Sequence, residues 1–199
     1  EQERVLSDTE RVAGRTALRN NVEAAVALAG AVQSTLGPKG LDKLLVGADG
    51  SNVVTNDGVT VLESALVEHP TAKMLISTSR AQDDETKDGT TSTVVLTSEL
   101  LVNALELVDR GVHPAVIAQG YRLCGPVVDA TLSEIAIDAN EHTRRAAVLT
   151  ALSGKGDEGM RAHLAELAHV AAGAMGTSDP EHCRIITERN GSIADSEYV

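Results

Sequence analysis

Four short polar segments combine glycines with carboxylates, hydroxyls and lysines in this sequence of 199 residues. They are 35–40 (TLGPKG), 55–58 (TNDG), 84–93 (DETKDGTTST) and 152–159 (LSGKGDEG). Carboxylates are preferred ligands of Mg²⁺, hydroxyls and lysines donate hydrogen bonds to phosphate oxygens, and glycine lets the backbone approach a ligand closely. Three of the five lysines of the chain, Lys39, Lys87 and Lys155, lie in these segments. Together, these groups could hold a metal ion and a phosphate.

Each segment, taken alone, also has an ordinary structural explanation. The segment 37–40 lacks the spacing of a P-loop and is typical of a plain turn. The segment 56–58 could be a hairpin turn with a helix cap, and Asp88 has the form of an N-cap aspartate ahead of a helix. The loop that carries Lys155 could be a surface linker. The residues themselves leave these alternatives open.

The pattern of apolar residues places all four segments at the ends of helices or strands. A helix predicted over 15–36 is ended by Gly37 and Pro38, and strands over 43–46 and 52–55 are predicted to form a hairpin around 47–50. Further helices are predicted from Pro70 toward Arg80, over 94–108, from Pro114 to Leu132, over 141–152 and over 157–175, followed by a β-prone tail with an Asn-Gly turn over 183–193. Because a helix N-terminus exposes unpaired N–H groups and a positive dipole end, it favours anions. The sequence therefore predicts a helical body with a small β element at each end.

The composition narrows the classes of function. The formal charge is −12, from 17 basic and 29 acidic residues, which argues against nucleic-acid binding through a basic surface. Few lysines and many carboxylates suit concentrated salt, so a halophilic source and an ordinary acidic cytosolic protein are both consistent with the sequence. No apolar run is expected to span a membrane, and the charged N-terminus has no signal-peptide core. We expect a soluble, cytoplasmic protein with a core of small aliphatic side chains, since the chain contains no Phe or Trp.

The order of the four segments, with their flanking residues, resembles the N-terminal part of a group II chaperonin subunit, of the thermosome/CCT family. The resemblance covers nearly the whole chain from about Thr16 onward. The matching segments are 34–46 (STLGPKGLDKLLV), 53–62 (VVTNDGVTVL), 67–75 (VEHPTAKML), 82–96 (QDDETKDGTTSTVVL), 111–121 (GVHPAVIAQGY), 151–156 (ALSGKG) and 191–199 (GSIADSEYV).

The resemblance implies a mainly α fold, in which an equatorial helical bundle with a small β-hairpin precedes the start of an intermediate hinge domain. Residues 1–142 would form the N-terminal segment of the equatorial nucleotide-binding domain, and 143–199 the first half of the hinge domain. The apical domain and the C-terminal equatorial segment would be absent from this chain.

The resemblance also implies a site for ATP and Mg²⁺. Asp88 would coordinate the metal, Asp57 would help to orient the water that attacks the γ-phosphate, and Lys155 would sense that phosphate and relay its presence to the hinge. The remaining implied nucleotide contacts are Leu36, Gly37, Pro38, Lys39, Gly58, Gly89, Thr90, Thr91 and Ser92.

The implied activity is ATP-driven protein folding by a double ring built from copies of this subunit or paralogous subunits, with unfolded proteins as substrates of the absent apical domain. The hairpin would pair with the terminal strands of a neighbouring subunit. One alternative is a truncated nucleotide-binding or ring-contact module that does not hydrolyse ATP, and another is a helical oligomerisation protein without nucleotide binding. One departure lies in the site itself, because the family usually has glycine where this chain has Lys87, whose side chain we expect to point into solvent.

Overall fold

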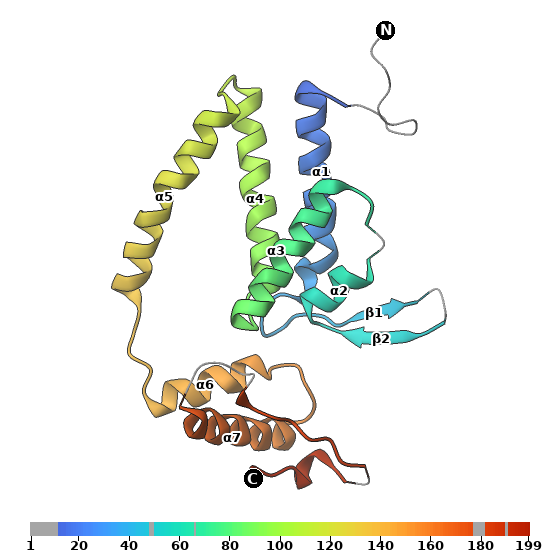
Figure 1. Ribbon diagram of the computed structural model, residues 1–199, viewed down its shortest axis with the longest axis vertical. Helices are drawn as coiled ribbons and strands as arrows, with labels where there is room; N and C mark the ends of the chain where they lie inside the picture. Colours follow the sequence, from blue (N-terminus) through green and yellow to red (C-terminus); the bar gives the residue numbers. More distant parts are fainter. Residues whose placement is uncertain (1–11, 48–49, 66, 177–181, 190) are drawn as a thin grey trace. The chain divides into compact units, whose positions relative to one another are not determined.

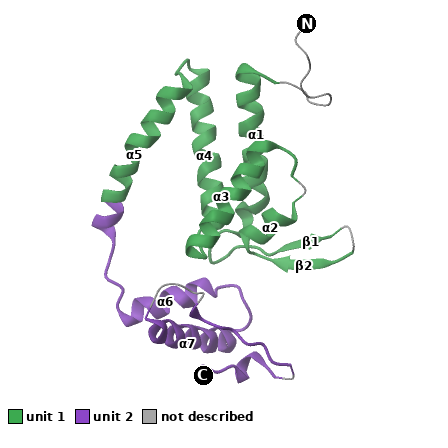
Figure 2. Ribbon diagram, in the orientation of Figure 1, with its two compact units in different colours: residues 1–130 green, residues 131–199 purple. Residues whose placement is uncertain are grey.

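The computed structural model describes residues 12–47, 50–65, 67–176, 182–189 and 191–199. The chain forms two compact units, residues 1–130 and 131–199 (Figures 1 and 2). This boundary lies inside a helix, whereas the domains implied by the resemblance divide at 142/143. That division concerns the domains of a longer protein and stays a prediction.

Helices dominate both units. Unit 1 contains α1 (Gly14–Val32), the 3₁₀ helix η1 (Gln33–Thr35), strands β1 (Lys43–Val46) and β2 (Asn52–Thr55), α2 (Gly58–Ser64), α3 (Pro70–Thr86), α4 (Thr90–Asp109) and most of α5 (Pro114–Ile135). Unit 2 contains the end of α5, α6 (Glu141–Ala151), α7 (Glu158–Met175) and the 3₁₀ helix η3 (Ile193–Asp195). The mainly α fold class with a two-stranded hairpin is thus confirmed.

The core of unit 1 consists of small aliphatic side chains where α1, α2, α3 and α4 meet. Ala25 and Val32 of α1 and Val94 of α4 are fully buried, and Leu62 of α2 is 1% exposed. At the other end of α4, the side chain of Asp109 pairs with Arg19 near the start of α1 at 2.7 Å. The two helices are therefore antiparallel, and the end of α1 lies beside the start of α4 (Figure 1).

The hairpin confirms the predicted strands residue for residue. β1 and β2 pair antiparallel, with Lys43 opposite Thr55 and Val46 opposite Asn52. Residues 48 and 49 of the predicted turn lie outside the described residues. The predicted helix over 15–36 is α-helical only to Val32 and continues as a 3₁₀ turn to Thr35.

The predicted β element at the C-terminal end is wrong for the described residues of 183–193. They contain no strand, and Ile185 and Ile186 are 88% and 70% exposed. A strand requires hydrogen bonds from a neighbouring strand. No described segment supplies them here, so β-branched side chains alone do not produce a strand.

α4 corrects the expectation that no segment has the length and composition of a membrane span. Among the described helices, α4 alone is long and apolar enough to cross a membrane. It has 20 residues, and its most apolar 18-residue window has a mean hydropathy of 1.3. Core helices of soluble proteins meet the same criteria. Here, 17% of the apolar window of α4 is buried, and Val94 and Ser98 are among its buried residues.

We predict that Leu62→Ala lowers the free energy of unfolding of the chain by about 2–4 kcal/mol, because it leaves a cavity in this core. Leu96→Ala is the matched control, since Leu96 is 62% exposed on α4. Its cost should stay below about 1 kcal/mol. Urea unfolding followed by circular dichroism measures both, and equal costs would contradict the described core.

Candidate functional site

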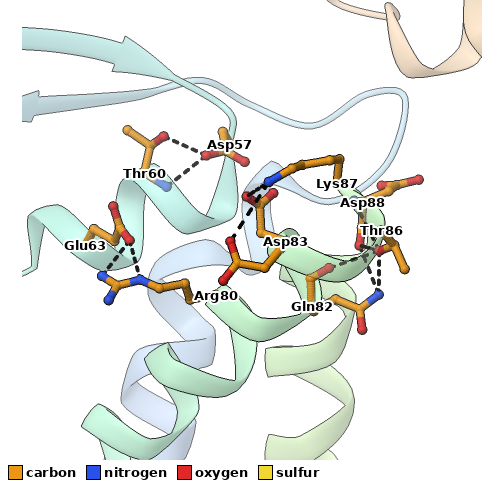
Figure 3. Close-up of polar contacts among 10 residues, drawn as sticks. Asp57, Thr60, Glu63, Arg80, Gln82, Asp83, Thr86, Lys87 and Asp88 are labelled. Atoms are coloured by element: carbon orange, nitrogen blue, oxygen red, sulfur yellow. Dashed lines mark hydrogen bonds and ion pairs between the residues drawn. The ribbon is translucent and has the colours of Figure 1, made fainter. Parts of the chain in front are cut away.

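Three of the four polar segments meet at one end of unit 1. Gly58, the first residue of α2, is buried directly against Thr91 in the first turn of α4, and a Cβ atom at Gly58 would overlap the Thr91 Oγ1 atom. The 3₁₀ helix η1, which leads into the loop 36–40, also packs against α4. The close-up in Figure 3 shows the start of α2 and the α3–α4 turn with their polar contacts.

The first turn of α4 presents free donors to this end of the unit. Its first backbone hydrogen bond runs from Thr93 N–H to the carbonyl of Gly89, the N-cap, at 2.9 Å. Within the described residues, neither the N–H nor the hydroxyl of residues 90–92 has a hydrogen-bond partner, whereas the Thr93 and Thr97 hydroxyls bond back to carbonyls of α4 and its cap. Three N–H groups and three hydroxyls at a helix N-terminus suit the oxygens of an anion.

Asp88 is not the N-cap of α4, which corrects one local interpretation of its sequence. The cap position belongs to Gly89, whose φ of 77° is readily adopted by glycine. Asp88 precedes it, and its Oδ1 accepts a hydrogen bond from the Gly89 N–H at 2.7 Å. The Asp88 side chain is exposed and forms no ion pair within the described residues. Its carboxylate is therefore open to a cation from solvent.

Asp57 caps α2, as one interpretation of its sequence held. Its Oδ2 accepts hydrogen bonds from the N–H and the hydroxyl of Thr60 at 2.8 and 2.6 Å. Its other oxygen, Oδ1, accepts none from the described residues. The cap thus fixes the side chain and leaves one oxygen available.

The loop 36–40 is a tight turn, as its local interpretation held. Its backbone closes through bonds from Gly40 N–H to the Gly37 carbonyl (2.9 Å) and from Leu41 N–H to the Ser34 carbonyl (2.8 Å). Gly37 has a φ of +85°. Leu36, Gly37, Pro38 and Lys39 are all exposed, and Lys39 has no ion pair among the described residues. The turn therefore displays a free ammonium group to solvent.

Lys87 occupies the left-handed C-cap position of α3, with φ 56° and ψ 18°. Its Nζ lies 3.4 Å from Asp83 Oδ2 and 4.0 Å from Asp84 Oδ1, and its side chain is 53% exposed. The exposure agrees with the expected solvent-facing side chain. The positive φ gives a physical reason for glycine at this position, because a side chain is strained there.

Two residues that sequence reasoning missed fix the turn before α4. Gln82 Nε2 donates a hydrogen bond to the Asp88 carbonyl at 3.1 Å, and Thr86 Oγ1 lies 2.8 Å from the same oxygen (Figure 3). Gln82 and Thr86 also bond to each other at 2.9 Å. Their spacing of four at a helix end was the available signal, since it places both side chains on one face.

Lys155 belongs to unit 2 and is described there by itself. Its loop follows α6 and contains two glycines with positive φ, Gly154 at +80° and Gly156 at +61°. Arg161 of α7 holds the Gly156 carbonyl at 2.7 Å. Lys155 is exposed, without an ion pair among the described residues, so its ammonium is free.

The donor set fits Mg²⁺ bound together with phosphate better than a closed metal centre. The described residues contain no group of three or more His, Cys, Asp or Glu side chains placed to hold a metal. Mg²⁺ commonly takes one or two carboxylates and completes its shell with waters and phosphate oxygens. One exposed carboxylate at Asp88, beside the unpartnered donors in the first turn of α4, matches that pattern.

Comparison with known proteins identifies the family. The TCP-1/cpn60 chaperonin family matches over residues 28–199. The chain therefore belongs to the TCP-1/cpn60 chaperonin family, and the group II resemblance is confirmed by its similarity to thermosome subunits. It is 43% identical over 199 residues to thermosome subunit alpha of Thermoplasma acidophilum and 45% identical over 202 residues to thermosome subunit beta of Archaeoglobus fulgidus.

These alignments cover 96% of this chain but only 36% and 37% of the two relatives, so the chain spans little more than a third of their length. A solved structure described as a group III chaperonin in the open state superimposes with a TM-score of 0.66 at 34% sequence identity. That match covers 83% of this chain and 33% of the other. The fold of the chain is therefore that of the corresponding part of a chaperonin subunit.

We predict that Gly58→Ala lowers the free energy of unfolding by about 1–3 kcal/mol, because the new methyl group forces α2 away from Thr91. Gly30→Ala is the control, since nothing lies within 4 Å of a Cβ at this position of α1. It should raise stability by about 0.5–1 kcal/mol. The double variant Gly58→Ala/Thr91→Ala should recover part of the loss, and additive effects would argue against the contact.

We predict that Lys87→Gly is more stable than Lys87→Ala by about 1 kcal/mol, because only glycine adopts the left-handed C-cap without strain. Both variants remove the same ammonium, so the comparison isolates the backbone. Thermal unfolding measures the difference. Equal melting temperatures would show that residue 87 does not hold a positive φ.

Proposed function

We propose that unit 1 binds ATP with Mg²⁺ at the first turn of α4. The observation that carries this proposal is the set of free N–H and hydroxyl groups of Thr90, Thr91 and Ser92, in a chain of the chaperonin family. Thr91 among them packs against Gly58. Phosphoryl transfer from ATP needs positioning and charge neutralisation rather than a protein nucleophile. Backbone donors, hydroxyls and a metal-binding carboxylate supply both.

Each loop then has a distinct task. Residues 89–92 wrap the phosphates, while the exposed turn from Leu36 to Lys39 lines the nucleotide and Lys39 adds a positive charge. Asp88 holds Mg²⁺, which supplies charge neutralisation of the phosphate oxygens when it is bound. The carboxylate of Asp57 is already fixed by Thr60 through Oδ2, so its free Oδ1 can accept a hydrogen bond from the water that attacks the γ-phosphate.

The activity of the whole protein is a further proposal, because the chain spans 36% and 37% of its thermosome relatives. We infer an ATP-hydrolysing chaperonin subunit of the cytoplasm that assembles with copies of itself or with paralogous subunits in a double ring and assists folding of unfolded proteins. Residues 1–142 and 143–199 then belong to the equatorial and intermediate domains. The free ammonium of Lys155 senses the γ-phosphate and relays its presence to the hinge.

The exposed hairpin supports ring contacts. Leu44 and Val46 of β1 are 64% and 69% exposed, and Val54 of β2 is 66% exposed. Within the described residues, β1 and β2 pair only with each other, so both outer edges are open. Apolar strands with open edges suit pairing with strands of a neighbouring subunit.

The second candidate is a nucleotide-binding or ring-contact module that does not hydrolyse ATP. It is favoured by the fact that the chain spans only 36% and 37% of its thermosome relatives. Nucleotide binding is common to both candidates. A hydrolysis assay on the complete polypeptide that contains this chain separates them.

We predict that Asp88→Asn weakens Mg-ATP binding by at least about ten-fold, the loss expected for one charge-assisted contact. Its effect on ATP binding without Mg²⁺ should be small. Asp57→Asn should retain affinity, because asparagine still caps α2. It should lose hydrolysis, because it removes the carboxylate assigned to the attacking water. Isothermal titration and phosphate release measure these effects in the complete polypeptide.

Asp84→Asn is the control for general charge, since Asp84 is 71% exposed in the same region. Unchanged Mg-ATP affinity in Asp88→Asn, or an equal loss in Asp84→Asn, would refute the assignment of Asp88. Unchanged hydrolysis in Asp57→Asn would refute the role of Asp57.

A further inference from the structure

Lys87 is held in a conformation that a side chain seldom adopts. It is the one residue other than glycine with a positive φ in the part of the chain that the structure describes. Its ion pairs with Asp83 and Asp84 are long, at 3.4 and 4.0 Å, and all three side chains are partly exposed, so these contacts stabilise the turn weakly. Strained positions concentrate where a side chain has a task.

The direction of the side chain indicates what that task is. Figure 3 shows Lys87 extending from the α3–α4 turn to the side on which Asp57 lies, whereas Asp88 extends to the opposite side. Lys87 is also two residues ahead of Gly89, the N-cap of the anion-binding turn. The ammonium lies against Asp83 and Asp84 in the last turn of α3, on the side of the turn where Asp57, assigned above to the attacking water, also lies.

The local charge gives this ammonium a partner when a nucleotide enters. Asp57 lies at the α2 start, Asp83 and Asp84 in the last turn of α3, and Asp88 just before α4, so a triphosphate approaches an acidic environment. An ammonium on a flexible side chain can exchange one anionic partner for another at little geometric cost. A terminal phosphate carries more negative charge than the Asp83 carboxylate, whose ion pair with Lys87 is long at 3.4 Å. The phosphate is therefore the stronger partner for the ammonium.

We propose that Lys87 contacts the terminal phosphate of ATP, and that binding moves its ammonium from Asp83 to that phosphate. ADP lacks this phosphate, so Lys87 favours ATP over ADP. This inference rests on the proposed nucleotide site and adds a specificity-determining residue to it. Glycine at position 87 leaves the turn unstrained but cannot make the contact.

The test compares dissociation constants of ADP and of the β,γ-imido analogue of ATP, with Mg²⁺, in the complete polypeptide. Lys87→Met keeps a long side chain on the same strained backbone and removes only the charge. It should weaken the ATP analogue about ten-fold and ADP less than about two-fold. Lys87→Arg should restore the preference for the ATP analogue.

Lys73→Met is the matched control, because Lys73 lies in the first turn of α3, at the end of the helix remote from Lys87. An unchanged ratio of the two dissociation constants in Lys87→Met overturns the inference, as does an equal loss for both nucleotides or the same shift in Lys73→Met. If the wild-type polypeptide binds neither nucleotide, the proposed function fails as well. If wild type binds both and Asp88→Asn weakens Mg-ATP while Lys87→Met changes no ratio, only the role of Lys87 is wrong.

Discussion

The site depends on the close approach of two helix N-termini, at the contact of Gly58 with Thr91. Both residues are buried, and only the absence of a Cβ at Gly58 lets α2 lie against the first turn of α4. Each helix start carries a partial positive charge, so the two ends repel unless a negative group lies near them. Asp57 supplies one by capping α2, while the donors of α4 remain unfilled. The packing of α2 against α4 thus leaves unfilled donors in a region of positive potential, which favours an anion there.

The unfilled donors of α4 would allow a chain of net charge −12 to bind the proposed polyanion. Net charge governs long-range attraction, which is screened by salt, whereas the first turn of α4 acts at hydrogen-bond distance. Its N–H and hydroxyl groups carry no formal charge and need no counter-ion in the free protein. The carboxylate of Asp88 would repel a bare nucleotide, but it attracts one whose phosphates carry a divalent cation. At the proposed site, the acidic composition would therefore favour the magnesium complex over the free nucleotide.

The sequence predicted what depends on local chemistry. Turn residues set the hairpin strands at 43–46 and 52–55, and Pro70 marked the start of α3. The sequence-based prediction was wrong where secondary structure depends on a partner distant in the sequence. The β-prone residues Ile185 and Ile186 have no strand to pair with among the described segments. In the site, the loops were recognisable by their residue types, but the cap position of Gly89 was not. Which loops share one end follows from the antiparallel packing of α1 and α4, which periodicity alone does not specify.

The hairpin has exposed apolar side chains and an open edge, whose packing partners are not specified by this chain alone. Two strands by themselves are marginally stable in water, yet β1 and β2 form with apolar side chains exposed. The hairpin is anchored at its base, where β2 leads through Asp57 into α2 and Leu45 packs against the buried core. Pairing of its free edge with another chain would therefore act on the residue that precedes Gly58. Because that residue caps α2 beside the donors of α4, strain at the hairpin would be coupled to occupancy of the proposed nucleotide site. By linkage, each would influence the other by the same free energy.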